Sequence, residues 1–575
     1  MKNEEIAKIF HDLGFLTEVE DDVNAGFKAR AYHKAADVIA SLPTSVEEIY
    51  RKEGLRGLLA IPAIGKAIAS KIEEYLTTGK IMHLEELKEK IPIAINELSA
   101  IEGIGPKTVK VLFNKLKIRN LNDLERAIIE GKLRGISGFT EKKQQSILQH
   151  IQFVRKGMTR FLIGEVYPSV REIESRLSTI EGVRKAIAAG SVRRMKETVG
   201  DADYLVVSED FQRVIDSFVT MPEVESILSR GESKASVRLK NGMNADLLVV
   251  PEESFGSALQ YFTGSKEHVI EIRKIAIEKG LRINEWGVFD NKGNRIAGSN
   301  EEEIYHILGL EWIPPEMREN NGEIDLAKSG KLPKLVEYGS LLGDLQVHSN
   351  NTDGTMSIEE MALYAREQFG LNYIAITDHT KSLALAHGLD EKGLLEQTNR
   401  IAELNNKMDN FRILSGAEVN IMKDGSLDIP NNVLDKLDIV GAAIHSNFSQ
   451  PIEVQTERLV KAANNPSVDI LFHPTGRLIN KREGYQVDIE KVISVAKDTD
   501  TVLEIDAHYN RLDLRDEYVR MAIQNGVKLV IDSDAHHPLH YAFLVFGIAQ
   551  ARRGWAQSSD ILNTLSVNDL LKNLK

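Results

Sequence analysis

Residues 190–203 read GSVRRMKETVGDAD, and residues 244–250 read NADLLVV. Each stretch places carboxylates beside an apolar run. Side chains two apart on a strand point to the same face, so we expect Asp201 and Asp203 to project together, flanked by Asp246. Three carboxylates at the edge of an apolar sheet repel one another unless divalent cations neutralise them, and magnesium prefers such oxygen ligands. The two stretches therefore predict a sheet edge with a two-metal phosphoryl-transfer site.

The residues upstream of these aspartates suit a nucleotide. Gly190 and Ser191 allow backbone N–H groups to approach phosphate oxygens, and Arg193 or Arg194 offers a bidentate clamp. A DxD pair alone is more often an ordinary strand with charged ends, because short motifs recur by chance. The glycine, the serine, the paired arginines and the later aspartate together favour a nucleotide site.

Composition limits the class of protein. The 575 residues exceed what one core holds and indicate roughly three to five domains. The sequence shows neither an apolar run of about 18 residues nor a signal-peptide pattern, so we expect a cytoplasmic protein. Without cysteine, metals must be held by His, Asp, Glu or neutral oxygens. The net charge is −13, yet residues 51–150 carry 18 Lys and Arg against 12 Asp and Glu, which allows a local DNA-binding surface.

The N-terminal part contains two helix-hairpin-helix patterns. Residues 61–72, IPAIGKAIASKI, turn around Gly65, and GIGP follows at 103–106; LRGISGFTEKKQQSIL at 133–148 is a weaker third copy. Backbone N–H groups at such helix starts suit DNA phosphates. A plain packing unit is the alternative for any single copy. The expected DNA-binding residues of the hairpins are Gly65, Lys66, Gly103, Gly105 and Lys107.

The C-terminal part repeats apolar strands that end in metal-ligand residue types. Examples are LGDLQVHS, LNYIAITDHT, LDIVGAAIHS, VDILFHP and VKLVIDSDAHH, with helical patterns between them. This alternation predicts a β/α barrel, whose active site lies at the carboxyl ends of the strands. One histidine after a strand is more often a capping or core residue. Several such ends, with Glu418, favour clustered metals and phosphoester hydrolysis.

Residues 190–203 and 244–250 resemble the palm of family-X DNA polymerases, the group containing DNA polymerase beta. The likeness continues through YFTGSKEHVIEIRKIAIEKGLRINEWGVF at 261–289. It implies that Asp201, Asp203 and Asp246 hold two Mg²⁺ or Mn²⁺ ions, and that Ser191, Arg194 and Gly200 contact the triphosphate of a deoxynucleotide. It further implies that Tyr261, Phe262 and Gly264 border the sugar and that Arg273 faces the template. Met195 and Val269 depart from the pattern, where DNA polymerase beta has glycine and asparagine.

A second resemblance covers the N-terminus. AYHKAADVIASLP at 31–43 and the first hairpin look like the lyase domain of DNA polymerase beta. The likeness implies that Lys71 removes a 5′-deoxyribose phosphate, with Lys28, Tyr32 and Lys66 around the phosphate. A neighbouring cation such as Lys66 would favour Schiff-base chemistry at an amine. A solvated helix lysine is the ordinary alternative, and Ala63 replaces a hairpin glycine.

The C-terminal part resembles the PHP (polymerase and histidinol phosphatase) domain, a distorted (β/α)7 barrel. The family's opening HxH is here Gln346-Val347-His348, and an amide oxygen is a weaker ligand than imidazole. His537 adjoins His536, and the pattern does not decide firmly between them. The likeness implies Mn²⁺ or Zn²⁺ on a set of eight ligands. These are His348, Asp353, His379, Glu418, His445, His473, Asp534 and His536.

The resemblances together predict a multidomain chain. We expect an all-α helix-hairpin-helix region with a lyase-like domain (1–80) and a DNA-binding subdomain (81–155), an α+β nucleotidyltransferase palm (156–258), a nucleotide-selecting subdomain (259–315), a linker or wrapping loop (316–338) and the PHP barrel (339–575).

The implied function is template-directed, gap-filling DNA synthesis in base-excision repair by a monomer that takes gapped or primed DNA and deoxynucleoside triphosphates and contacts no membrane. The barrel would supply 3′–5′ exonuclease activity, and also abasic-site endonuclease or 3′-phosphatase activity. Template-independent tailing of RNA is a rival within the nucleotidyltransferases. A DNA-binding polymerase scaffold with a structural, weakened barrel is the other alternative, because of Gln346.

Overall fold

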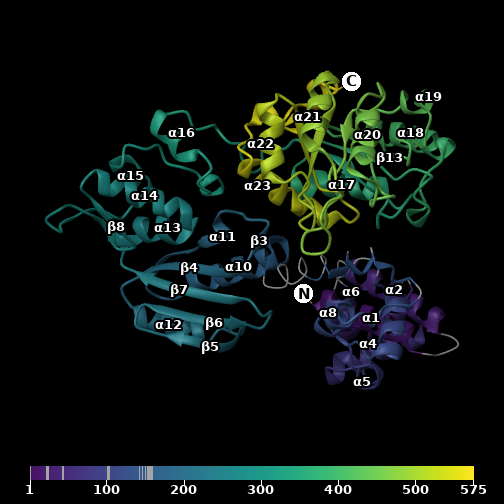
Figure 1. The fold of residues 1–575 in the computed structure, drawn as a ribbon, viewed down its shortest axis with the longest axis horizontal. Helices are drawn as coiled ribbons and strands as arrows, with labels where there is room; N and C mark the ends of the chain where they lie inside the picture. Colours follow the sequence, from purple (N-terminus) through teal and green to yellow (C-terminus); the bar gives the residue numbers. More distant parts are fainter. Residues whose placement is uncertain are drawn as a thin grey trace. The chain divides into compact units, whose positions relative to one another are not determined.

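The computed structural model describes residues 2–20, 25–41, 45–61, 63–99, 101, 104–136, 138–141, 143–145, 147–148, 151 and 160–574. Gly103, one of the expected DNA-binding residues, lies outside them. The chain divides into two compact units, residues 1–158 with 480–482, and residues 159–479 with 483–575 (Figure 1). No helix of the described residues is long and apolar enough to cross a membrane.

The first unit is entirely helical. Its helices share one core that runs from Ile6 to Ile151. Two helices begin at the expected hairpin glycines: Gly65 and Gly105 each have extended backbone immediately before the helix. The helices are α1 (Lys2–Val19), α2 (Ala25–Ser41), α3 (Val46–Ala60, interrupted at Gly54), α4 (Lys66–Thr78), α5 (Met82–Lys90), α6 (Ile95–Ser99), α7 (Pro106–Leu116) and α8 (Leu121–Ile129).

The palm in the second unit is a five-stranded sheet in the order β2-β4-β7-β6-β5. Alternate residues of β4 pack on opposite faces: Tyr204 lies in the core that includes α10 and α12, and Leu205 contributes to the core that includes α13. A short ladder of β1 (Phe161–Leu162) and β3 (Thr198–Val199) adjoins it. The palm elements are α10 (Ile163–Ser178), β2 (Val183–Ala188), α11 (Gly190–Arg193), β4 (Asp201–Ser208), α12 (Phe211–Val219), β5 (Val224–Arg230), β6 (Lys234–Leu239) and β7 (Asn244–Val250).

The next subdomain packs α13 (Phe255–Thr263), α14 (Lys266–Glu278) and α15 (Glu301–Ile307) with the small antiparallel sheet of β8 (Arg282–Asn284), β9 (Gly287–Phe289) and β10 (Arg295–Ala297). The segment 316–338, expected as a linker, is packed and partly helical. It contains α16 (Glu323–Ser329), which follows the 3-10 turn η2 (Pro315–Met317).

Buried charges hold this segment in place. The guanidinium of Arg318 is fully buried and lies 2.6 Å from Glu301, and Glu323 lies 2.7 Å from the buried ring of His268. Such pairs need partners at fixed places. Segment 316–338 is therefore part of the folded unit, which its low apolar periodicity did not reveal.

The C-terminal part is the expected barrel of seven parallel strands in chain order. The strands are β11 (Gly343–Val347), β12 (Tyr373–Ile376), β13 (Arg412–Asn420), β14 (Ile439–Ala443), β15 (Ile470–Leu471), β16 (Val502–Asp506) and β17 (Leu529–Asp532). A bridge between Val347 and Ala535 brings the chain after β17 to β11, so the barrel is nearly closed.

Helices alternate with these strands and lie around them (Figure 1). The first helix starts at a complete capping box of Ser357 and Glu360. The helices are α17 (Ile358–Phe369), α18 (Glu391–Asn405), α19 (Asn431–Leu434), α20 (Ile452–Ala463), α21 (Ile489–Asp498), α22 (Asp516–Gln524), α23 (Leu544–Arg553) and α24 (Val567–Leu571).

Two departures from the family pattern fall on left-handed backbone. Ala63 has φ +61° and Met195 has φ +49°, and both stand where the family has glycine. Left-handed backbone costs an L-residue about 1–2 kcal/mol. The Met195 side chain is buried in the palm core, which offsets part of this cost, whereas Ala63 is exposed.

We therefore expect Ala63→Gly to stabilise the first unit locally. The gain should be up to about 1 kcal/mol, because relief of the left-handed strain exceeds the added entropy of glycine in the unfolded chain. Hydrogen exchange of α4 peptides in the full chain measures it, as slower exchange. Ala67→Gly, an exposed alanine within α4, is the matched control and should accelerate exchange. Faster exchange in both variants would contradict the assignment of strain.

Candidate active sites

The three palm aspartates lie at one end of a parallel strand pair. Strands β4 and β7 run parallel, with Asp203 opposite Asp246 and Asp201 opposite Asn244. Burial, followed by Asp201 and Asp246, raises the pKa of Asp203 to about 7. Burial and Asp246 also raise the pKa of Asp201. The carboxylates are thus close enough to repel one another.

Hard divalent cations suit this donor set. Strand register places Asp203 beside Asp246, and Asp201 lies on the same strand two residues away. Carboxylates that repel one another and resist ionisation gain most from a cation of the Mg²⁺ or Mn²⁺ type. The palm edge therefore fits the expected ions.

The side chain of Asp203 leaves no room for a Cβ atom at Gly190. Gly190 has φ +59°, and a Cβ atom there would lie 2.0 Å from Oδ2 of Asp203. The backbone N–H of Ala189 donates to the carbonyl of Asp203 at 2.7 Å. Hence the chain before Ser191 crosses directly over the aspartate, which only glycine allows. Sequence reasoning had linked this glycine to phosphate alone.

The two arginines of the motif have different surroundings. Arg193 pairs with both carboxylate oxygens of Glu301, at 2.8 and 2.9 Å, and with the hydroxyl of Thr263 at 2.6 Å. Arg194 donates from Nε to Glu319 at 3.0 Å and from Nη1 to the carbonyl of Thr263 at 2.5 Å. Arg193 thus forms a bidentate pair with its carboxylate, whereas Arg194 meets its carboxylate through Nε alone. Arg194 is therefore the less neutralised of the two and better placed to meet an anion.

Of the expected sugar and template residues, Gly264 lies beside Arg194, and Tyr261, Phe262 and Arg273 contact one another. Gly264 has φ +72°, and a Cβ atom there would lie 2.9 Å from Nη1 of Arg194. Tyr261 stacks edge-on against Phe262, with ring centroids 5.2 Å apart, and under the guanidinium of Arg273 at 4.9 Å.

The remaining palm positions differ in exposure. Ser191 and Gly200 are both half-buried beside the carboxylates, and a Cβ atom on Gly200 would lie 3.5 Å from Arg160. Val269, where the family has asparagine, is buried in α14 and offers no polar group.

The N-terminal residues are arranged less tightly. Tyr32 is buried on α2, and burial raises its pKa although Lys28 opposes the shift. Lys66 and Lys107 are exposed at the starts of α4 and α7, and Lys71 is half-buried. Lys66 and Lys71 are five residues apart on α4, which separates them by roughly 140° around the helix. The cation invoked for Lys71 therefore lies on another side of that helix.

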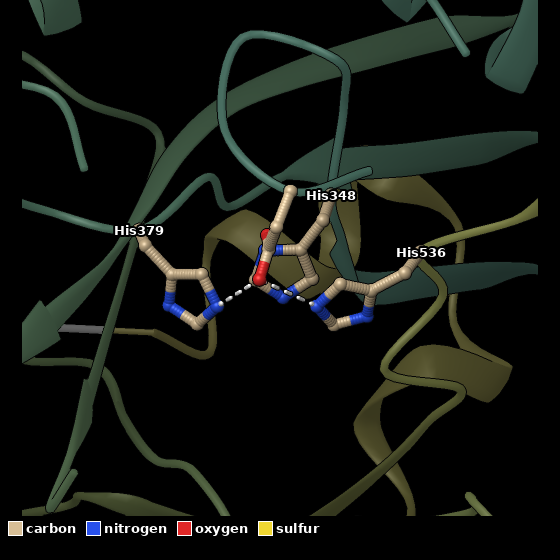
Figure 2. A group of neighbouring side chains, drawn as sticks. His348, His379 and His536 are labelled. Atoms are coloured by element: carbon tan, nitrogen blue, oxygen red, sulfur yellow. Dashed lines mark ion pairs between the residues drawn. The ribbon is translucent and has the colours of Figure 1, made fainter. Parts of the chain in front are cut away.

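All eight expected barrel ligands converge at the strand ends. In the first group, Oδ2 of Asp353 lies 3.4 Å from Nε2 of His379 and 3.5 Å from Nε2 of His536. His348 lies between these rings (Figure 2), and its Nε2 is 3.2 Å from Oδ1 of Asp534. Four donors of this group, from His348, Asp353, His379 and His536, lie within 4.8 Å of one another.

The second group is built on Glu418. Its Oε2 lies 3.0 Å from Nδ1 of His379, and its Oε1 lies 3.1 Å from Nε2 of His445 and 2.8 Å from Nε2 of His473. His379 belongs to both groups. The donors of His379, Glu418 and His445 also lie within 4.8 Å of one another.

Buried donors of the barrel are incompletely hydrogen-bonded. Both ring nitrogens of His348 and Oε2 of Glu418 make no well-aligned hydrogen bond within the described residues, although each lies within 4.0 Å of another ionisable side chain of the cluster. Burial opposes ionisation of Glu418, but His379 and His445 outweigh it and hold its pKa well below the usual range. Incompletely hydrogen-bonded imidazole and carboxylate donors are costly to bury unless a cation binds them. The barrel end therefore fits a transition metal such as Mn²⁺ or Zn²⁺.

Residues behind the ligands orient them. Oδ1 of Asn420 lies 2.8 Å from Nδ1 of His445, the ring nitrogen that faces away from Glu418. Asp378 accepts hydrogen bonds from Ser349 and Thr352 at 2.7 Å each, which holds the loop before Asp353. Sequence reasoning missed both, although Asn420 stands two residues after Glu418 and Asp378 adjoins His379. Such partners fix the orientation of ligands.

Gln346 and His537 have different surroundings in the barrel. Gln346 is fully buried on β11, and both polar atoms of its side chain lack partners among the described residues. Nδ1 of His537 accepts the backbone N–H of Leu539 at 3.1 Å and caps a 3-10 turn. His536, by contrast, belongs to the first group, so the structure distinguishes the two histidines.

Profiles of three known domains match the chain. They are the helix-hairpin-helix domain over residues 1–81, the SAM-like helix-hairpin-helix tandem over residues 95–152, and the DNA polymerase beta thumb over residues 258–319.

Several known proteins are similar in sequence. The DNA polymerase/3′-5′ exonuclease PolX of Bacillus subtilis (strain 168) is 37% identical over 578 residues, covering 100% of both chains. DNA polymerase lambda of Arabidopsis thaliana is 27% identical over 55% of this chain and 62% of its own. A probable phosphatase of Thermoanaerobacter sp. (strain X514) is 33% identical over 33% of this chain and 78% of its own. Since the Bacillus relative matches from end to end, the chain belongs to the family-X DNA polymerases with a PHP-type C-terminal region.

Proposed function

We propose that the chain is a template-directed DNA polymerase that fills gaps and that its barrel removes nucleotides from 3′ ends. The observation that carries the synthetic part is the register of β4 and β7, which aligns Asp203 with Asp246 beside Asp201. The full-length relative is named as both a DNA polymerase and a 3′–5′ exonuclease. Substrates would be gapped or primed DNA and deoxynucleoside triphosphates, and the protein would act as a monomer.

In synthesis the primer 3′-oxygen attacks the α-phosphorus of the nucleotide, and pyrophosphate leaves. Asp201, Asp203 and Asp246 would hold two Mg²⁺ or Mn²⁺ ions. Such ions stabilise the negative charge that develops on the attacking and leaving oxygens. Arg194 would bind the triphosphate with Ser191 and Gly200. Tyr261, Phe262 and Gly264 would border the sugar, and Arg273 would face the template.

In the barrel, water would cleave the terminal phosphodiester. His348, Asp353, His379 and His536 would hold one cation, and Glu418, His445 and His473 would hold another. Asp534 would belong to the first of these two sites, because it lies beside His348. Cations held there would polarise the phosphoester. The donor set also suits abasic-site endonuclease or 3′-phosphatase chemistry, and the barrel relative is named a probable phosphatase.

The proposed division of labour follows the expected domains. Residues 1–80 and 81–155 would bind DNA phosphates through helix starts at Gly65, Lys66, Gly105 and Lys107, with Lys71, Lys28 and Tyr32 at a 5′-phosphate for a lyase step. Together with gap filling, this would serve base-excision repair in the cytoplasm of a bacterial cell, where its DNA lies.

A scaffold with a weakened barrel is the second candidate. Gln346 favours it, because a neutral amide stands where the family has an imidazole, and its buried polar atoms lack partners among the described residues.

A substitution in the palm should remove DNA synthesis alone, and a substitution in the barrel should remove 3′ nucleotide cleavage alone. Asp201→Ala should abolish template-directed primer extension, by more than roughly a hundredfold, and leave Mn²⁺-dependent removal of 3′ nucleotides intact; His348→Ala should do the reverse, because each loses a ligand. Gel assays on gapped DNA opposite each template base measure both. Loss of 3′ removal in both variants, or in neither, would remove that activity from the barrel. Extension indifferent to the template base would reject directed synthesis.

Synthesis should need more Mg²⁺ at low pH. A carboxylate whose pKa is raised to about 7 is protonated below that pH, so protons compete with the cation at Asp203. The half-saturating Mg²⁺ concentration for single-nucleotide insertion should rise roughly tenfold per pH unit below 7 and level off above it. The rate at saturating Mg²⁺ is compared separately, because it also reports the primer hydroxyl. A half-saturating concentration that does not change between pH 5.5 and 7 would contradict this reading of Asp203.

Gln346→His should strengthen metal binding in the barrel. An added imidazole is a better ligand than an amide, so the full chain should retain more Mn²⁺ or Zn²⁺ after dialysis, measured as metal per chain. Gln346→Leu is the matched control and should fall below the wild type if the amide oxygen binds metal. Equal metal content in all three proteins would show that this position is not a ligand.

A further inference from the structure

Helix α23 of the barrel carries a buried arginine that reaches the palm. The side chain of Arg553 is only 3% exposed, and its Nη1 donates to the backbone carbonyl of Arg194 at 3.1 Å. Its Nη2 donates to Asp516 of α22 at 2.5 Å, which fixes the guanidinium on the barrel. The barrel thus contacts the motif turn directly.

The same guanidinium also reaches the side chain of Arg194, through Glu319. Oε1 of Glu319 accepts from Nη1 of Arg553 at 3.1 Å and from Nε of Arg194 at 3.0 Å. Burial opposes ionisation of Glu319, but Arg553, Arg194 and Lys196 outweigh it and lower its pKa. Glu319 is therefore a charged bridge, so that Arg553 restrains both the backbone and the guanidinium of Arg194.

Apolar contacts accompany these bonds. Phe546 and Ala549, both of α23, lie in the same buried core as Val192 and Met195 of the motif turn. The turn itself contains the left-handed residues Gly190 and Met195. Strained backbone persists only where its surroundings hold it, and part of those surroundings comes from the barrel.

We propose that Arg553 is a positioning residue for DNA synthesis, which places Arg194 against the triphosphate of the incoming nucleotide. The inference rests on the proposed role of Arg194. The barrel would then support synthesis independently of its own metal site. Without Arg553, Glu319 and the backbone carbonyl of Arg194 would lose their contact with the barrel, and the guanidinium of Arg194 would be held less firmly against the nucleotide.

The test compares Arg553→Gln with Arg552→Gln in the full chain. Arg552 precedes Arg553 on α23 and is similarly committed, with Nε 2.7 Å from Glu316 and Nη1 2.7 Å from the carbonyl of Val336, but it does not touch Arg194 or Glu319. We expect Arg553→Gln to raise KM for the nucleotide about tenfold in single-nucleotide gap filling, with DNA affinity and 3′ nucleotide removal unchanged. Arg552→Gln should leave KM unchanged. Arg553→Lys should lie between, because an ammonium lacks the planar fork that serves these three acceptors.

The outcomes separate the inference from the proposed function. An unchanged KM in Arg553→Gln, or an equal rise in Arg552→Gln, would overturn the positioning role. If Arg553→Gln also loses 3′ nucleotide removal, its folding has failed, and Glu319→Gln decides instead: it keeps an acceptor but loses the charge, and a raised KM supports the role whereas an unchanged KM refutes it. Arg194→Gln should raise KM by itself, and no effect there would refute the nucleotide role of Arg194, not its placement by Arg553.

Discussion

Parallel strand pairing is the constraint on which both sites depend. Parallel strands bring the same ends of successive strands to one edge, so residues far apart in sequence meet there. In the palm, this pairing sets Asp203 against Asp246. In the barrel it brings His348 and His379 together with His536 from the far end of the same part (Figure 2). Each edge thereby concentrates charge and unpaired donors that a folded protein tolerates only with cations.

Gathering charged groups at the strand ends of the palm and of the barrel costs free energy. This cost explains why further residues support both sites. Asp378 and Asn420 hold barrel elements from behind, and Glu301 and Glu319 neutralise the two motif arginines. Asn420, Glu301 and Glu319 lie outside the motifs that the sequence pattern indicates, and Asp378 lies inside one of them but is not among its expected ligands. They are needed because buried charges are tolerated only in fixed geometry.

Much of the fold could be predicted from sequence, because strand periodicity, hairpin glycines and strand-end histidines are local signals. The aspartates and the eight barrel ligands were predicted from such signals and the family resemblance. Long-range partners were not: the pairing of Arg193 with Glu301 joins residues 108 apart, and only the fold shows that this arginine is already engaged. Likewise, His536 and His537 are neighbours in sequence, and only the backbone turn after β17 assigns them different roles. Segment 316–338 lacks clear periodicity because its few buried apolar residues, such as Met317, Ala327 and Val336, are widely spaced, and buried charged side chains supply the other contacts.

Segment 316–338 also affects how the parts that it connects can move. It is anchored at one side through Arg318 and Glu323 to the subdomain of α13, α14 and α15, and at the other through Glu316 to Arg552 of the barrel. A rotation of one part against the other must break buried ion pairs, which costs far more than bending an open linker. The palm edge and the barrel edge are therefore tied to each other through buried ion pairs, and a DNA end that passes from synthesis to removal would have to travel between them.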